Sequence, residues 1–198
     1  MMKLDTAEIR RPVNKAVGVS PCGDATLVFE NDSYLLFAIV DGAGHGKEAA
    51  KVADSAIHFI EKHREENLSH ILLSIHRNMM NTCGGVASIC RINKKTGGMS
   101  YCGVGNITTR LFKPESVRLV SRDGVLGHEI CRPLIKEIQL KRGDIVMMYS
   151  DGVVDHFEVG EVPHFYGLAS IDIAKISVER FRKSHDDASC VVAKVIYD

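Results

Sequence analysis

The sequence has no excess of charge of either sign. Its 198 residues contain 25 Lys and Arg and 25 Asp and Glu, so the formal net charge is zero. A protein that binds nucleic acid or an anionic membrane through bulk electrostatics usually carries a basic surplus. The balance therefore predicts no nucleic-acid or membrane partner, and any binding specificity must be local.

Long apolar runs and paired cysteines are also missing. No apolar run reaches the roughly 18 residues that a membrane-spanning helix needs. The first residues, MMKLDTAEIRRP, have no apolar segment of the kind found in signal peptides. The six cysteines are scattered without a C-x-x-C pair, which argues against zinc or redox chemistry. We therefore expect a cytoplasmic protein with reduced cysteines.

Internal repeats, low-complexity tracts and long Pro/Ser linkers are absent as well. Hydrophobic residues make up 45% of the chain, and its length suits one substantial core and falls short of two. We expect a single domain over residues 1–198, acting as a monomer.

The first half of the chain combines a strand pattern with a helix pattern. Residues 26–31 and 34–41 are rich in β-branched and aromatic residues and flank a polar turn, which predicts a hairpin. Apolar residues then recur every three or four positions over 49–60 and again over 68–79, which predicts two helices. Asn67 or Ser69 would cap the second helix.

The second half is mostly strands. Residues 85–93, 99–105 and 106–112 are predicted as an antiparallel meander of three strands. Two more strands, a helix that includes Ile171 to Phe181, and a closing strand follow. This order predicts an α+β protein in which mainly antiparallel sheets are covered by helices.

The stretch AIVDGAGHGK (38–47) allows two interpretations. Its glycines and Lys47 suggest a loop that cradles a nucleotide phosphate, whereas Asp41 suggests a carboxylate held at a strand end for a metal. A P-loop requires G-x-x-x-x-G-K-[ST], and Glu48 follows Lys47 where the hydroxyl should be. The spacing G-x-G-x-G also fails to match a dinucleotide fingerprint. The nucleotide interpretation is therefore weak.

The carboxylate interpretation gains support from other aspartates. Asp41 and Asp151 each end an apolar strand and precede glycine, while Asp24 and the pair Asp186-Asp187 precede strands. In an antiparallel pair the start of one strand lies beside the end of the next, so Asp24 and Asp41 should meet at one edge. Asp151 and Asp186 join them if the last strand runs antiparallel to its partner. Such a cluster repels itself unless a cation neutralises it. Oxygen ligands favour Mg²⁺ or Mn²⁺ over zinc.

These motifs together resemble a known family. CGDA, VDGAGHGKEA, TGGMSYCGVGN, LKRGDIVMMYSDGVVD and DDASCVVA occur in the order of the SpoIIE-type branch of the metal-dependent (type 2C, PPM) Ser/Thr protein phosphatases. The resemblance runs from about Cys22 to the end. It implies a four-layer α/β/β/α sandwich with a two-metal site at one end of the paired sheets.

The resemblance also implies roles for individual residues. Asp41 would bridge two Mn²⁺ or Mg²⁺ ions, and the carbonyl of Gly42 would bind one of them. Asp151 and Asp186 would bind the other ion, with Asp187 as the alternative to Asp186. Asp24 would support the site directly or through water. The nucleophile would be a hydroxide that bridges the metals.

The substrate would then be phosphoserine or phosphothreonine on a partner protein. The short chain, CGD and YCGVGN resemble the stressosome phosphatases of this family, which implies phosphorylated STAS-domain scaffold proteins as partners. The complete acidic set favours an active enzyme over an inert module that keeps the fold to regulate a partner. A phosphatase of small phosphoesters is a weaker alternative.

Several basic or polar residues have two open interpretations. His45 would act as a general acid or phosphate contact, or would simply pack at a helix start. Arg10 and Arg11 would reach a phosphate, or would be solvated. Asn106 stands where many relatives have histidine, and it is interpreted as part of a strand turn. The connection from Ser121 to Pro133 is too short for a large substrate-gripping flap.

Overall fold

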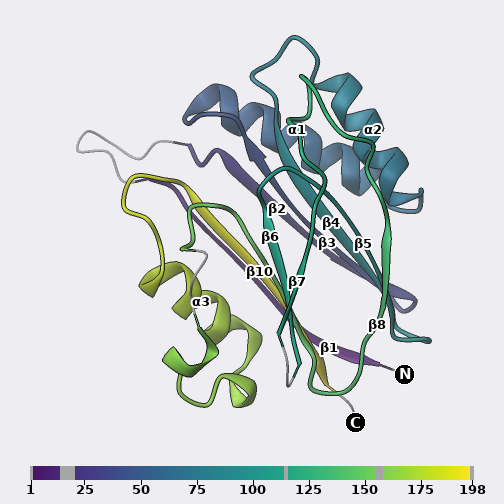
Figure 1. Ribbon diagram of the computed structural model, residues 1–198, viewed down its shortest axis with the longest axis vertical. Helices are drawn as coiled ribbons and strands as arrows, with labels where there is room; N and C mark the ends of the chain where they lie inside the picture. Colours follow the sequence, from purple (N-terminus) through teal and green to yellow (C-terminus); the bar gives the residue numbers. More distant parts are fainter. Residues whose placement is uncertain (1, 14–20, 114–115, 155–157, 197–198) are drawn as a thin grey trace.

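Two five-stranded sheets form the centre of the computed structural model, which describes residues 2–13, 21–113, 116–154 and 158–196 (Figure 1). We call them the β1 sheet and the β3 sheet. The β1 sheet has the order β1 (Lys3–Arg11), β10 (Ala188–Ile196), β9 (Ile145–Tyr149), β6 (Thr108–Phe112) and β7 (Val117–Leu119). The β3 sheet has the order β2 (Asp24–Glu30), β3 (Tyr34–Gly42), β4 (Gly85–Asn93), β5 (Gly98–Val104) and β8 (Lys136–Gln139). All neighbouring strands in both sheets are antiparallel.

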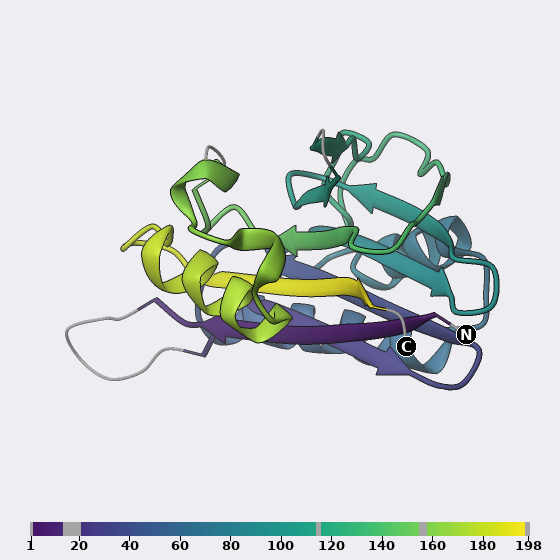
Figure 2. The same cartoon turned by 90° about the horizontal axis from the view of Figure 1, so that it is seen from below.

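Helices cover the outer face of each sheet. The helices α1 (Lys47–Lys62) and α2 (Leu68–Asn78) pack on the β3 sheet, and α3 (Ser170–Arg180) packs on the β1 sheet. Two short 3-10 helices, η1 (Val159–Glu161) and η2 (Phe165–Gly167), precede α3. Figures 1 and 2 together show α3 on one side of the paired sheets and α1 and α2 on the other. The predicted α/β/β/α sandwich is confirmed. Within the described residues, no helix combines the length and apolar character needed to cross a bilayer.

Strand β3 shows why its sequence is an unbroken apolar run. Leu36, Ala38 and Val40 are buried against α1 and α2. The alternate residues Leu35, Phe37 and Ile39 are buried between the two sheets. A strand that is covered on both faces cannot alternate with polar residues. The strand therefore delivers Asp41 from a fully buried segment to the end of the sandwich.

The predicted three-stranded meander is wrong. Strands β4 and β5 pair as expected, but β6 belongs to the other sheet, where it lies between β9 and β7. The chain leaves the β3 sheet at Gly105, which has a φ of 93°. A Cβ atom there would lie 2.1 Å from Val86 Cγ1, so only glycine fits this crossing. Apolar periodicity in the sequence predicts where strands occur, but it does not predict to which sheet each strand belongs.

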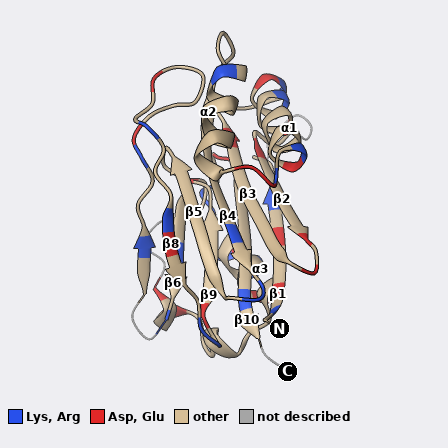
Figure 3. Ribbon diagram, turned by 90° about the vertical axis from the view of Figure 1, so that its right-hand side faces the viewer, with Lys and Arg blue, Asp and Glu red and all other residues tan. Residues whose placement is uncertain are grey.

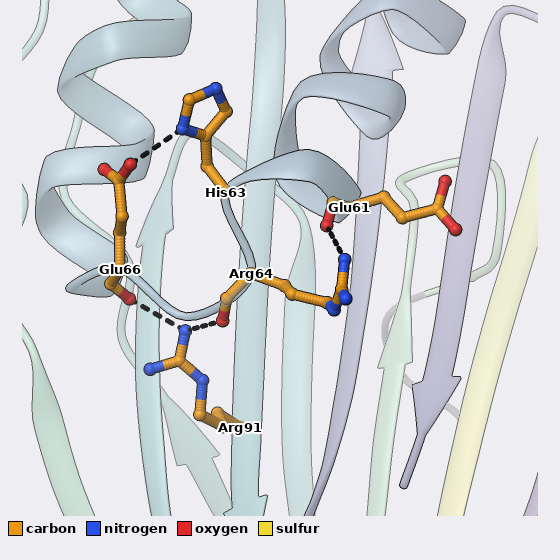
Figure 4. Close-up of polar contacts among 5 residues, drawn as sticks. All are labelled: Glu61, His63, Arg64, Glu66 and Arg91. Carbon is orange, nitrogen blue, oxygen red and sulfur yellow. Dashed lines mark hydrogen bonds and ion pairs between the residues drawn. The ribbon is translucent and has the colours of Figure 1, made fainter.

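The loop between α1 and α2 is fastened to the sheet beneath it. Asn67 caps α2, because its side-chain oxygen accepts bonds from the amides of Ser69 and His70. The guanidinium of Arg91 on β4 donates to the carbonyls of Arg64 and Glu66, the latter at 2.8 Å (Figure 4). One side chain of the sheet therefore satisfies two carbonyls of the loop.

Replacing Arg91 by Met should lower the free energy of unfolding by about 1–3 kcal/mol, because two carbonyls lose their donor. Because this loop lies at the opposite end of α1 from Asp41, the substitution should affect stability alone. Urea unfolding followed by circular dichroism measures the effect. Arg132→Met, at an exposed position, is the matched control. Equal stability of the two variants would contradict the role of this contact.

Candidate metal centre

Asp24 and Asp41 stand directly opposite each other on β2 and β3. Both lie at one end of the sandwich. The pair Lys3 and Ile196, where β1 begins and β10 ends, lies at the opposite end. Asp24 is buried, and its Oδ2 accepts a hydrogen bond of 2.6 Å from the hydroxyl of Ser150. Because Ser150 follows β9, this bond joins the two sheets. The predicted meeting of Asp24 and Asp41 at one edge is confirmed.

Asp151 comes to the same end from the β1 sheet. Its Oδ2 accepts a hydrogen bond of 2.8 Å from the side-chain amide of Asn106. Asn106 was interpreted from the sequence as part of a turn; the structure shows in addition that it orients a carboxylate. Its donor group leaves the other oxygen of Asp151 available for a cation.

The two neighbouring aspartates before β10 differ in their surroundings. Asp187 is buried, and its two oxygens accept bonds from the backbone amides of Val13 at 2.6 Å and Gly23 at 2.7 Å. Asp186 is partly exposed, and its Oδ1 accepts the Asp187 amide at 2.9 Å. The carboxylate of Asp187 is therefore engaged by one amide after β1 and one amide before β2, so Asp186 is the better candidate ligand.

This difference predicts separate phenotypes for two substitutions. Asp186→Asn should raise the Kd for Mn²⁺ by about 10- to 100-fold and leave the melting temperature in EDTA unchanged. Asp187→Asn should lower the melting temperature in EDTA, because a buried charged acceptor of two amides is lost. Calorimetric Mn²⁺ titration and thermal melts separate the two effects. The opposite assignment of effects would make Asp187 the ligand.

Electrostatics shows how closely the carboxylates are grouped. Burial, followed by the charges of Asp24, Asp151 and Asp186, raises the pKa of Asp41 to about 9. Burial also raises the pKa of Asp24 to about 6, against the opposing bond from Ser150. For Asp186, burial and the charge of Asp151 raise the pKa. The protein thus holds acidic groups in positions that are unfavourable without a cation or protons.

The donor set fits hard divalent cations. The candidate ligands described at this edge are carboxylate and carbonyl oxygens, and such ligands suit Mg²⁺ and Mn²⁺. Among the described residues, no three His, Cys, Asp or Glu side chains are close enough together to hold one ion by themselves. Mg²⁺ is commonly held by one or two carboxylates and keeps several waters. The residues present therefore fit ions that complete their coordination with water and backbone oxygens.

The glycines after the two strand-ending aspartates have packing roles. A Cβ atom on Gly42 would lie 2.3 Å from the carbonyl oxygen of Ala49, so the first turn of α1 packs directly on it. A Cβ atom on Gly152 would lie 1.8 Å from the carbonyl oxygen of Asp187. Each glycine lets another backbone segment approach the carboxylate edge.

The basic candidates have distinct positions. His45 is exposed, between Gly44 and Gly46, in the loop that leads from Asp41 into α1. Arg10 and Arg11 pair with Ser189 and Ala188 in the register of β1 and β10, at the carboxylate end. Their guanidinium groups lie 3.9 Å from Asp54 and 3.8 Å from Glu179, in exposed ion pairs.

The short connection after β7 forms a tight hairpin at this end of the sandwich. Arg122 exchanges backbone bonds with Gly103 and Gly105, and Leu126 exchanges them with Gly85. Gly84 in turn accepts the amide of Ala43 from the loop after Asp41. The hairpin is therefore held by backbone hydrogen bonds beside the loop that follows Asp41.

Comparisons with known proteins agree with this geometry. The family model of Stage II sporulation protein E (SpoIIE) matches residues 31–196. The chain belongs to the SpoIIE family. It is a phosphatase with the PP2C fold. The phosphoserine phosphatase RsbX of Bacillus subtilis (strain 168) is 28% identical over 138 residues, which cover 69% of each chain.

Solved structures of the family share the whole fold. A chain in a bacterial stressosome structure, described as a modular system adapted to control secondary messenger signalling, superposes with a TM-score of 0.88 and 28% identity. That match covers 97% of this chain and 100% of the other. RsbX in complex with magnesium matches with a TM-score of 0.85 and 22% identity, covering 99% of this chain and 100% of RsbX. The SpoIIE phosphatase structure from Bacillus subtilis has a TM-score of 0.80 at 20% identity, and the match covers 100% of this chain and 63% of that one.

Two residues at the candidate site were not singled out as contributors from the sequence. Ser150 bonds to Asp24, and Asn106 bonds to Asp151. Ser150 directly precedes the Asp151-Gly152 motif, and that adjacency was the only available signal for it. The signal for Asn106 was its place where many relatives have histidine, but its bond to a residue 45 positions later could not be predicted from that.

Proposed function

We propose that the protein is a metal-dependent phosphatase of phosphoserine and phosphothreonine on STAS-domain stressosome scaffold proteins, of the RsbR and RsbS kind. The observation that supports it best is the joining of acids from both sheets at one end. Asp24 and Asp41 come from the β3 sheet, and Asp151 and Asp186 adjoin the β1 sheet. The relatives named for RsbX and for the stressosome support the choice of partner.

The residues would divide the work as follows. Asp41 would lie between two Mn²⁺ or Mg²⁺ ions, helped by the Gly42 carbonyl, while Asp151 and Asp186 would hold the second ion. Asp24 would support the other carboxylates, held in place by its hydrogen bond from Ser150. When bound, the two cations would supply an acidified water as nucleophile and neutralise the phosphoryl oxygens. His45 is placed in the loop after Asp41, where it would protonate the leaving serine oxygen or contact the phosphate.

The test is phosphate release by the purified chain. With Mn²⁺ it should hydrolyse p-nitrophenyl phosphate and a phosphorylated STAS-domain protein, and EDTA should stop both reactions. Mass spectrometry of the scaffold proteins would identify which phosphosites disappear. Binding of the phosphoprotein that is equal in EDTA and in Mn²⁺, with no turnover of either substrate, would show an inert module instead. Faster turnover of small phosphoesters than of phosphoproteins would point to a metabolite phosphatase.

A further inference from the structure

A groove lies between α1 and α2 on the outer face of the β3 sheet. The two helices run over the same sheet face, as Figures 1 and 3 show, and the space between them has a volume of about 480 Å³. One face of α1 forms one wall. The end of α2 and the turn after it, including Asn78, Met79 and Cys83, form the other.

The floor of the groove is apolar. Its lining includes Val52, Ala56, Ile75 and Met79, which belong to the core beneath the helices, and the partly buried Phe59. The Phe59 ring also stacks on His63, with 4.1 Å between the ring centroids. An apolar floor with a polar rim is typical of surfaces that receive another molecule.

The rim is predominantly basic. Lys51, His58 and Lys62 line it from α1, and within the described residues none of the three has an ion-pair or hydrogen-bond partner. His63 is paired with Glu66 at 2.7 Å, as Figure 4 shows. Glu48 is the one acid in the lining. The groove therefore offers apolar contact together with unpaired cations.

The groove opens toward the catalytic end of the molecule. Glu48 lies in the first turn of α1, directly after the loop that carries Asp41 and His45. A protein held in the groove would thus be held beside the carboxylates. Lys62, by contrast, stands at the far end of α1 and extends the surface away from the reacting phosphate.

We propose that this groove docks the phosphoprotein substrate through an amphipathic helix that carries acidic residues beside its apolar face. This inference rests on the proposed function. A helical occupant is favoured because α1 forms one whole wall, and the backbone groups of a helix are already bonded and offer no partners to an extended strand. An acidic occupant is favoured by the unpaired Lys51 and Lys62.

A docking surface separate from the carboxylates would also explain how a small enzyme selects one phosphoprotein. The carboxylates and their ions would recognise a phosphate on any protein. The hairpin beyond β7 is short and is fixed to the sheet edge by its backbone, so it adds little surface that could wrap a peptide. Binding energy from a separate surface would raise kcat/KM for one phosphoprotein and leave small substrates unaffected.

The experiment compares two substrates across four variants. Lys51→Glu/Lys62→Glu reverses the rim charge, and Ser55→Trp fills the groove from an exposed position. The matched controls are Lys95→Glu/Lys175→Glu, exposed lysines off the groove, and Glu61→Trp, on another face of α1. The substrates are the phosphorylated STAS-domain scaffold protein and p-nitrophenyl phosphate, both with Mn²⁺.

We expect both groove variants to raise KM for the phosphoprotein by about tenfold, which corresponds to about 1.4 kcal/mol. Their kinetics with p-nitrophenyl phosphate should equal those of the parent and the controls. Unchanged KM for the phosphoprotein in both groove variants would overturn the docking site. A concentration-dependent dimer that Ser55→Trp abolishes, with KM unchanged, would assign the groove to a second copy of the chain and also overturn it.

Failure of the proposed function gives a different result. A parent protein without turnover of either substrate would refute the phosphatase and leave the groove open to a binding test. Calorimetric titration of the same phosphoprotein into the parent and the Lys51→Glu/Lys62→Glu variant then decides. Binding that the charge reversal weakens supports the groove, and equal binding overturns it.

Discussion

Replacing Asp41 by Asn should lower kcat for Mn²⁺-dependent phosphate release by about 1000-fold, equivalent to about 4 kcal/mol of transition-state stabilisation. Asp41 stands at the end of β3, opposite Asp24, and interacts with the charges of Asp151 and Asp186. An amide in this position removes the negative charge that would be shared between two cations. Asp151→Asn, on the other sheet, should have an effect of the same size.

The measurement is initial rate against p-nitrophenyl phosphate over a range of Mn²⁺ concentrations. Asp32→Asn is the matched control, because Asp32 is an exposed residue of the turn between β2 and β3. It should keep full activity. Full activity in both Asp41→Asn and Asp151→Asn would refute the carboxylate mechanism, whereas activity restored by high Mn²⁺ would assign these groups to metal affinity alone.

The second large effect concerns stability without metal. The pKa of Asp41 is raised from 3.8 to about 9 in the folded, metal-free protein. A carboxyl group with a higher pKa in the folded than in the unfolded chain binds more protons when folded, so it favours the fold at low pH. The free energy of unfolding in EDTA should therefore fall as pH rises from about 4 toward 9. Asp24, with a pKa of about 6, adds to the fall over the lower part of this range.

Bound cations should reverse this loss. A ligand at 100 times its Kd stabilises the folded state by about 2.7 kcal/mol, which raises Tm by about 5–10 °C for a chain of this size. Asp41→Asn should melt higher than the parent in EDTA at pH 8 and gain less from Mn²⁺. Differential scanning calorimetry between pH 5 and 9, with and without Mn²⁺, measures both effects. A pH-independent Tm of the parent in EDTA would contradict the grouping of the carboxylates.

Local elements could be predicted from the sequence, whereas the sheet to which a strand belongs could not. The hairpin of β2 and β3, the helices α1, α2 and α3, and the strand β10 follow from apolar periodicity and turn residues. Strand β1 was missed because its sequence, KLDTAEIRR, mixes charges into a strand whose partly exposed side chains lie at the edge of a sheet. Strand β7 has only three residues, too few for any periodic signal.

The candidate site was predictable because its geometry depends on strand ends. Antiparallel pairing places Asp24 opposite Asp41 without any long-range information. The same argument brings Asp151 and Asp186 together provided that the last strand runs antiparallel to its partner, and β10 and β9 do pair in this way. The distinction between Asp186 and Asp187 required the structure. It shows that both carboxylate oxygens of Asp187 already accept hydrogen bonds, from the backbone amides of Val13 and Gly23.

The bond between Asp24 and Ser150 spans 126 positions of the chain, and Asp186 directly precedes the strand β10. Strand β10 lies between β1 and β9, so the β1 sheet is open at its middle until this strand arrives. A nascent chain on the ribosome therefore contains Asp24 and Asp41 long before the proposed site can form. The proposed site is completed only when β10 fills the middle of the β1 sheet.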